Sequence, residues 1–293
     1  MSKRWRKFVV ASVAILVISV AVQDAPAAGT APTDTVFSYA RGFDTACAPT
    51  ESQMATWWQY SPYWNVGVYI GGDYIYCTGN PNLNPTWVSD IAAQGWMLLP
   101  IWGGPQAPAP CGTGGISTNT VTADSQGRSE AVRAHDAAVA LGMTGATVIF
   151  YDIEGFGAGN NSTCDNAVYA FLNGWDVVLR ETYGIHPGIY GSASGSGAQQ
   201  WAYLANVPDD VYLADTGSPP NTAPMSVWNL TGVSNDSWKI QPPYGRHHQH
   251  TNNVYETYGG LTIQIDAVCS RGHVAGTIQR GTDGTTPCPG TVP

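Results

Sequence analysis

The chain has 293 residues, of which 43% are hydrophobic and only 11% are charged, whereas a typical soluble domain has about 25% charged residues. This length can bury one large core, as a single α/β barrel or as two smaller domains. The 12 basic and 21 acidic residues give a net charge of −9, which argues against nucleic-acid binding because that function needs a basic surface.

Residues 1–27 have the layout of a secretory signal peptide. A basic patch at residues 3–7 precedes an uncharged apolar stretch at 8–22 and the sequence Ala-Pro-Ala at 25–27. The stretch is short for a membrane span, so we expect cleavage and a secreted, extracellular protein without a membrane segment, an uncleaved anchor being the alternative. Cleavage would leave 8 basic and 20 acidic residues, a net charge of −12.

Strand-like and helix-like patterns alternate along the rest of the chain. The predicted strands are residues 39–44, 66–71, 96–102, 147–154, 187–191, 211–215, 246–250 and 261–266. The predicted helices are residues 52–60, 85–94, 123–141, 165–183 and 198–205. Eight strands with helices between them predict an α/β fold, a single (β/α)8 TIM-like barrel over residues 28–270, with irregular segments in place of the last helices. A doubly wound sheet is the alternative, but no Gly-rich nucleotide-binding motif supports it.

Two segments lie outside this pattern. Residues 103–122 are rich in Pro and Gly, yet they include Cys111, so we expect a disulfide to order them. Residues 271–293 are rich in Gly, Thr and Pro and are predicted to form a tail.

All six cysteines lie in the predicted exported part: Cys47, Cys77, Cys111, Cys164, Cys269 and Cys288. An even number in an oxidising compartment predicts disulfides, for which sequence spacing leaves 15 pairings open. No C-x-x-C motif occurs, so we expect no metal and no other cofactor. His248 and His250 have metal-compatible spacing, but without a third ligand a structural or hydrogen-bonding role is favoured.

The acids Asp152 and Glu154 follow an apolar run at the end of the fourth predicted strand. Residues two apart on a strand point to the same side, and α/β enzymes place their sites at the carboxyl ends of strands. Two close carboxylates cannot both ionise freely, so one can stay protonated near neutral pH. We therefore predict a catalytic pair, with Glu154 as the protonated acid buried in the barrel mouth; a solvated strand end is the alternative.

Two more acids end predicted strands, Asp44 on the first and Asp266 on the last. Closure of a barrel makes these strands neighbours, so the two acids are expected side by side and across the mouth from Glu154. Independent loop-capping roles are the alternative. Trp102, Tyr151, Tyr190 and Trp228 are candidates for stacking on sugar rings, core packing being the alternative.

Several motifs carry a family resemblance. They are Gly42-Phe43-Asp44-Thr45-Ala46-Cys47-Ala48-Pro49, Val68-Tyr69-Ile70-Gly71-Gly72, Gly188-Ile189-Tyr190-Gly191-Ser192 and Tyr258-Gly259-Gly260-Leu261-Thr262-Ile263-Gln264-Ile265-Asp266. They resemble the secreted actinobacterial glycoside-hydrolase-like barrels long known as domain of unknown function 1906, which are similar in turn to the glycoside hydrolase family 25 lysozymes. The resemblance covers residues 42–266.

The resemblance implies roles for individual residues. Glu154 corresponds to the general acid and Asp152 to the Asp that orients the substrate 2-acetamido group. The predicted substrate-binding residues are Asp44, Asp266, Tyr69, Trp102, Tyr190, Asp215 and Gln249. The implied disulfides are Cys47–Cys77, Cys111–Cys164 and Cys269–Cys288. The chain departs from the family at Tyr212-Leu213-Ala214-Asp215-Thr216 and at His248-Gln249-His250, where relatives have Trp-Ile-Ala-x-Trp and His-Gln-Tyr.

These features together predict a monomeric, secreted, glycoside hydrolase-like protein that acts on an N-acetylated glycan, with bacterial peptidoglycan as the expected polymer. A non-catalytic glycan-binding protein of the cell wall, built on the same barrel, is the alternative from a different class.

Overall fold

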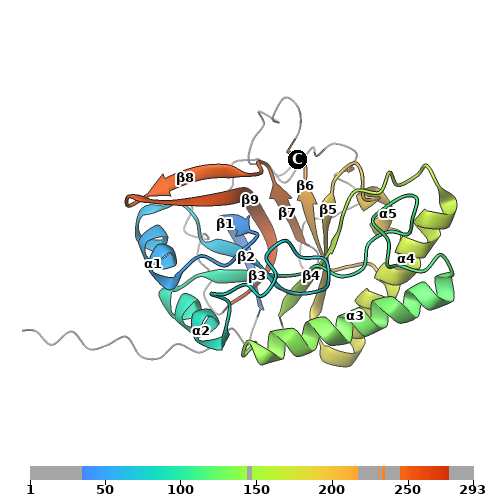
Figure 1. The fold of residues 1–293 in the computed structure, drawn as a ribbon, viewed down its shortest axis with the longest axis horizontal. Coiled ribbons are helices and arrows are strands. Elements are labelled where there is room, and N and C mark those ends of the chain that lie inside the picture. Colours follow the sequence, from blue (N-terminus) through green and yellow to red (C-terminus); the bar gives the residue numbers. More distant parts are fainter. Residues whose placement is uncertain (1–34, 144–146, 217–229, 231–232, 235–244, 277–293) are drawn as a thin grey trace, which may run out of the picture.

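The computed structural model describes residues 35–143, 147–216, 230, 233–234 and 245–276. Its strands form one sheet in the order β1-β2-β3-β4-β5-β6-β7-β9-β8, and pairing of β1 with β9 closes eight of them into a barrel (Figure 1). The strands are β1 (Thr35–Thr45), β2 (Asn65–Gly71), β3 (Met97–Trp102), β4 (Val148–Ile153), β5 (His186–Ser192), β6 (Asp210–Ala214), β7 (Gly245–Gln249), β8 (Val254–Tyr258) and β9 (Leu261–Ala275). The predicted α/β barrel is confirmed.

Helices cover the outside of the barrel between successive strands (Figure 1). They are α1 (Glu51–Tyr60), α2 (Pro85–Gln94), α3 (Thr120–Ala140), α4 (Ser162–Val177), the π-helical turn η1 (Val178–Thr182) and α5 (Ala198–Trp201). Helix α2 has the predicted bounds because Asn84 caps its first turn and Gly95 ends it with φ 106°, a conformation that favours glycine. Within the described residues no helix has the length and apolarity to cross a bilayer.

The last barrel strand runs opposite to the direction that a (β/α)8 barrel implies. Strands β1 to β7 are parallel neighbours, whereas β9 is antiparallel to both β1 and β7. The reason is the short connection: only residues 250–253 separate β7 from β8, and Gly259 and Gly260, with φ of 57° and 81°, form a tight hairpin turn to β9. The prediction missed strand β8, although the Gly-Gly pair between two alternating segments is a hairpin signal.

Strand β9 is also longer than predicted. It pairs with β1 over its whole length, from Asp44 opposite Asp266 to Thr35 opposite Ala275. The predicted start of the tail at residue 271 is therefore wrong, since residues 271–275 belong to the closing strand. Asp266 lies near the beginning of this strand and still reaches the carboxyl rim, because the strand is antiparallel.

The buried residues form an inner and an outer layer. Alternate side chains fill the barrel interior, among them Met97, Leu99, Ile101, Val148 and Phe150. Their neighbours on the same strands, together with the apolar faces of the helices, form the larger cluster outside the barrel. Successive side chains of a strand point to opposite faces of the sheet. The position of a residue in this alternation therefore decides whether its side chain at the end of a strand points into the barrel mouth or into the outer layer.

Candidate functional site

The acid-bearing strands meet at the carboxyl rim of the barrel, and Asp44 and Asp152 lie on the inward side there. In β4, Val148 and Phe150 face the interior, and Asp152 continues the same alternation. Asp44 and Asp266 are opposite each other in the pairing of β1 with β9, as predicted. The structure thus brings acids from β1, β4 and β9 to one mouth.

Asp152, and not Glu154, is the buried acid of the pair. Asp152 is 4% exposed, and its Oδ2 accepts a hydrogen bond of 2.9 Å from the Tyr69 hydroxyl. Its Oδ1 is buried without a hydrogen-bond partner among the described residues. Burial and the neighbouring Glu154 carboxylate raise the pKa of Asp152 to about 8, although the Tyr69 hydrogen bond opposes the rise. Glu154 lies just after β4 and is exposed, so the predicted burial of Glu154 is wrong.

Asp44 is buried to the same extent as Asp152. It is 4% exposed and accepts a hydrogen bond from the Tyr212 hydroxyl, which comes from β6. Burial first and the charge of Asp266 second raise the pKa of Asp44 well above its usual range, against the effect of the Tyr212 bond. Of these two acids, Asp152, with a pKa of about 8, favours its protonated form at neutral pH, and this form can donate as well as accept hydrogen bonds.

A chain of hydrogen bonds fixes Asp266. The Tyr190 hydroxyl donates to Gln249 Oε1 at 2.6 Å, and Gln249 Nε2 donates to Asp266 Oδ2 at 2.9 Å. The Asn253 backbone N–H donates to Asp266 Oδ1 at 2.5 Å. Tyr190, Gln249 and Asp266 thus share one network at the mouth.

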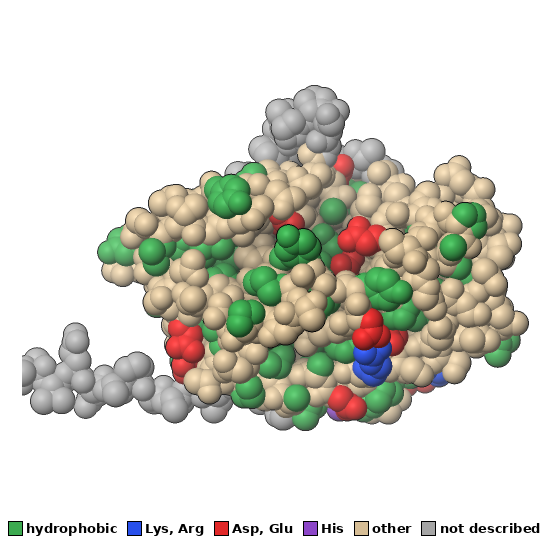
Figure 2. Space-filling view, viewed as in Figure 1, with side chains coloured by type: hydrophobic (Ala, Val, Ile, Leu, Met, Phe, Trp, Pro, Cys, Tyr) green, Lys and Arg blue, Asp and Glu red, His purple; other side chains and the backbone are tan. Residues whose placement is uncertain are grey.

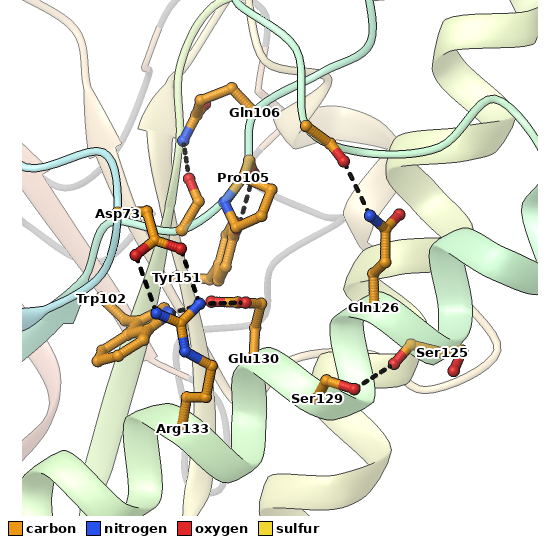
Figure 3. A network of polar contacts seen from close by, with 12 residues as sticks. Asp73, Trp102, Pro105, Gln106, Ser125, Gln126, Ser129, Glu130, Arg133 and Tyr151 are labelled. Atoms are coloured by element: carbon orange, nitrogen blue, oxygen red, sulfur yellow. Dashed lines mark hydrogen bonds and ion pairs between the residues drawn. The ribbon is translucent and has the colours of Figure 1, made fainter.

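Sequence reasoning missed Gln106, which joins the two halves of the D-x-E motif. Its side chain is 4% exposed; Nε2 donates to the Asp152 carbonyl oxygen at 2.9 Å, and Oε1 accepts from the Glu154 N–H at 2.8 Å. Gln106 lies in the Pro/Gly-rich segment (Figure 3). The disulfide Cys111–Cys164 attaches this segment to α4. The segment therefore positions the backbone of the acid pair, a role that local composition could not reveal.

Trp102 does not face the mouth, and its predicted place in the sugar-binding site is wrong. It belongs to the outer layer, where its Nε1 donates to Glu130 Oε2 at 2.7 Å and the Arg133 guanidinium lies 5.3 Å from its ring (Figure 3). Arg133 also bridges Glu130 and Asp73, at 2.7 and 2.9 Å. Trp102 is the last residue of β3, and its side chain points to the outside of the barrel. There this network holds it against α3.

The other predicted site residues have mixed outcomes. Tyr151, a candidate for sugar stacking, is fully buried in the outer layer, and its hydroxyl donates to the Pro105 carbonyl oxygen at 2.5 Å. Asp215 is buried directly after β6, where its N–H donates to the Gln249 carbonyl oxygen at 3.1 Å. Trp228 lies outside the described residues. In the described part of the chain, no cluster of three or more His, Cys, Asp or Glu could hold a metal ion.

Disulfides brace both sides of the mouth. Cys47 is bonded to Cys77, which joins the loops after β1 and β2, and Cys111 is bonded to Cys164, as the resemblance implies. Cys269 also takes part in a disulfide, and its predicted partner Cys288 lies outside the described residues.

The surface around the mouth is hollowed. Acidic side chains are visible on both sides of a hollow near the middle of the face in Figure 2. A cleft of about 460 Å³ lies over Asp44 and Asp266. A more open hollow of about 650 Å³ lies between α3, α4 and α5; among the described residues that line it, the one acid is Asp124, which pairs with Arg128. The acids of β1, β4 and β9 thus lie at the barrel mouth and not at this second hollow.

Comparison with known families agrees with this architecture. The Rv2525c-like, glycoside hydrolase-like domain matches residues 55–269, well over half of the chain. The chain belongs to this family. The family resemblance expected from the motifs is therefore confirmed. This member of the Rv2525c-like family has a glycoside hydrolase-like domain that is built as a barrel.

The chain matches solved structures at low sequence identity. The Mycobacterium tuberculosis Tat-secreted protein Rv2525c, solved in complex with L-tartrate, has a TM-score of 0.50 and 15% identity, over 80% of this chain and 96% of that one. The modular autolysin LytC from Streptococcus pneumoniae has a TM-score of 0.47 and 11% identity, over 79% of this chain and 46% of that one. No curated protein matches the chain by sequence.

Proposed function

We propose that the chain is a secreted glycoside hydrolase that cleaves an N-acetylated glycan, with bacterial peptidoglycan as its polymer, and that it acts as a monomer without a cofactor. The observation that carries the proposal is the acid arrangement of a glycoside hydrolase-like domain: an accessible Glu154 beside a buried Asp152. The disulfides at the mouth and the predicted signal peptide support export to an oxidising compartment.

Glu154 acts as the general acid in this proposal. A general acid must reach the glycosidic oxygen, and an exposed carboxyl at the rim can do so. The amide of Gln106 holds the Glu154 backbone N–H, so the position of the acid is fixed relative to Asp152.

Asp152 binds the acetamido group of the sugar. With its pKa raised to about 8, its carboxyl is protonated at neutral pH, and the buried Oδ1 can donate to the acetamido carbonyl oxygen. Tyr69 occupies the other oxygen and fixes the orientation of the carboxyl. Asp44 and Asp266 hold sugar hydroxyls on the opposite side of the mouth.

A non-catalytic glycan-binding protein is the second candidate, and the exposure of Glu154 favours it. The sequence predicted a buried, protonated Glu154, whereas the Glu154 carboxyl lies in solvent. There it can bind a sugar hydroxyl without transferring a proton.

Release of reducing ends from isolated bacterial walls and from N-acetylglucosamine polymers tests the proposal. Wild type should cleave, and Glu154→Gln should cleave roughly 10²- to 10⁴-fold more slowly, because the proton donor is lost while shape is kept. Glu181→Gln, at an exposed glutamate of η1, is the matched control and should cleave at the wild-type rate.

Two results would contradict hydrolysis by Glu154. Equal cleavage by wild type and Glu154→Gln would remove the catalytic assignment. Binding to one of these polymers without any cleavage by wild type would replace hydrolysis with the glycan-binding function.

A further inference from the structure

The cleft over the β1–β9 seam has one aromatic wall and one polar wall. It has a volume of about 460 Å³ and lies between the loop after β1, the loop after β2 and the start of β9. The lining residues that matter here are Asp44, Thr45, Tyr76, Asn253, Gln264 and Asp266.

Tyr76 forms the aromatic wall and is 94% exposed. An exposed tyrosine on a loose loop would lose conformational entropy on binding, but this loop is braced. The adjacent Cys77 is bonded to Cys47, and Asn80 Oδ1 accepts from the Ala48 N–H at 3.0 Å. The ring is therefore presented from a fixed backbone, and an aromatic face suits the apolar side of a pyranose.

The polar wall is fixed by hydrogen bonds across the start of β9. Asn253 has a left-handed backbone, with φ 53°, and its N–H caps Asp266. Gln264 Nε2 donates to Asn253 Oδ1 at 3.1 Å, and the Tyr255 hydroxyl donates to Gln264 Oε1 at 3.2 Å. Groups held in this way need little rearrangement when a ligand binds.

Thr45 supplies an observation independent of the acids. It is 5% exposed, it lines the cleft, and its hydroxyl has no hydrogen-bond partner among the described residues. A buried hydroxyl without a partner costs free energy that a ligand hydroxyl would recover. Next to it, burial and the charge of Asp266 raise the pKa of Asp44 well above its usual range, so the cleft disfavours a further negative charge.

We propose that this cleft is a subsite for an uncharged pyranose of the same glycan, with Tyr76 stacked on the ring and Asp44, Thr45 and Asp266 bonded to its hydroxyls. The inference rests on the proposed glycan specificity but not on hydrolysis. The class of ring follows from charge: a uronic acid would place its carboxylate against Asp44 and Asp266, whereas an N-acetylhexosamine brings no charge.

Calorimetric titration with the N-acetylglucosamine tetramer tests the subsite, in a Glu154→Gln background so that the sugar stays intact. Tyr76→Ala should weaken binding about tenfold, the order expected for loss of one aromatic contact, whereas Tyr76→Phe should retain it. Tyr203→Ala is the control, because Tyr203 is 76% exposed beside the hollow between α3, α4 and α5 and should not affect binding. Melting temperatures should be equal, since both rings are exposed.

A tetramer of galacturonic acid should bind at least about tenfold more weakly than the N-acetylglucosamine tetramer, because of like-charge repulsion. Equal binding of the neutral tetramer by the background protein and by its Tyr76→Ala variant would overturn the subsite, as would absence of binding at millimolar sugar. Equal affinity for the acidic tetramer would overturn the choice of an uncharged ring. Tyr76-dependent binding by a protein that cleaves nothing would support the subsite while refuting hydrolysis, so the two proposals fail separately.

Discussion

Asp152 and Glu154 are two residues apart, yet one carboxyl is buried and the other is in solvent. Asp152 is the last inward-facing residue of β4 and is covered by Tyr69 from β2, whereas Glu154 lies beyond the end of the strand. Two acids that are close in the sequence therefore lie in different environments. Such a difference is what separates the roles of paired carboxylates in enzymes.

This difference predicts the pH dependence of stability. Asp152 has a folded pKa of about 8 against an ordinary 3.8, so the unfolded chain binds fewer protons between these values. Its contribution to the free energy of unfolding is fully present near pH 4 and is lost as pH rises toward 8. We expect Asp152→Asn to match wild type near pH 4 and to be more stable at pH 8, by about a few kcal/mol.

Urea unfolding of both proteins across this pH range measures the difference. The control is Glu51→Gln, at an exposed glutamate that begins α1, which should give nearly the same small stability difference at both pH values. A difference between Asp152→Asn and wild type that does not grow with pH would show that Asp152 is not held protonated.

At the scale of elements, the packing of α3 against α4 supports the segment that holds the acid pair. Helices α3 and α4 approach through Gly127 and Gly174, where an added Cβ would lie 1.9 Å from the Phe171 carbonyl oxygen and 2.2 Å from the Asp124 carbonyl oxygen. Helix α4 begins beside Cys164, and Cys164 is bonded to the segment that carries Gln106. Glycine is required in both helices because no side chain fits between their backbones.

We therefore expect Gly127→Ala to destabilise the protein, by roughly 1–3 kcal/mol, even though alanine favours helix by about 1 kcal/mol over glycine. The overlap is with backbone atoms, which cannot rotate away. Ser129→Ala, at an exposed position of the same helix, should change stability by less than about 0.5 kcal/mol. Urea midpoints of the two variants provide the comparison, and a stabilised Gly127→Ala would show that the helices separate at little cost.

At the scale of the whole molecule, one strand closes the barrel. Strand β9 pairs with β1 from Asp44 to Thr35 and with β7 over four residues, from Arg246 to Gln249. The C-terminal half of β9 also contributes to a buried polar cluster around Asp210. The His273 N–H donates to the Asp210 carboxylate, and His247 Nε2 lies 3.4 Å from the same carboxylate. Residues 269–275 therefore supply both the edge pairing and the partners of buried charges.

We expect truncation after Val268 to prevent folding, because β1 and β7 would each lose part of their partner strand. Truncation after Gly276 in a Cys269→Ser background should keep the fold. The matched reference is the full-length Cys269→Ser, Cys288→Ser protein, and melting temperature is the measurement. A protein ending at Val268 that melted with this reference would show that β9 beyond Val268 is dispensable.

Patterns within single segments were sufficient for much of the fold. The apolar runs, capping residues such as Asn84, and glycines such as Gly95 predicted seven barrel strands and four helices near their observed positions, because these signals are local. The acids Asp44, Asp152 and Asp266 were likewise assigned to one rim, since barrel closure alone makes the first and last strands neighbours.

The tertiary structure decided the direction of the last strand, the side of the barrel to which a side chain points, and the contacts between residues far apart in the sequence. The Gly259-Gly260 hairpin reversed β9, the outward parity of Trp102 placed it under Arg133, and a segment 46 residues before Asp152 supplied Gln106. The sequence alone determined which acids meet at the mouth. Tertiary contacts, such as the hydrogen bond from Tyr69 of β2 to Asp152, decided which acid is buried, because burial depends on residues far apart in the chain.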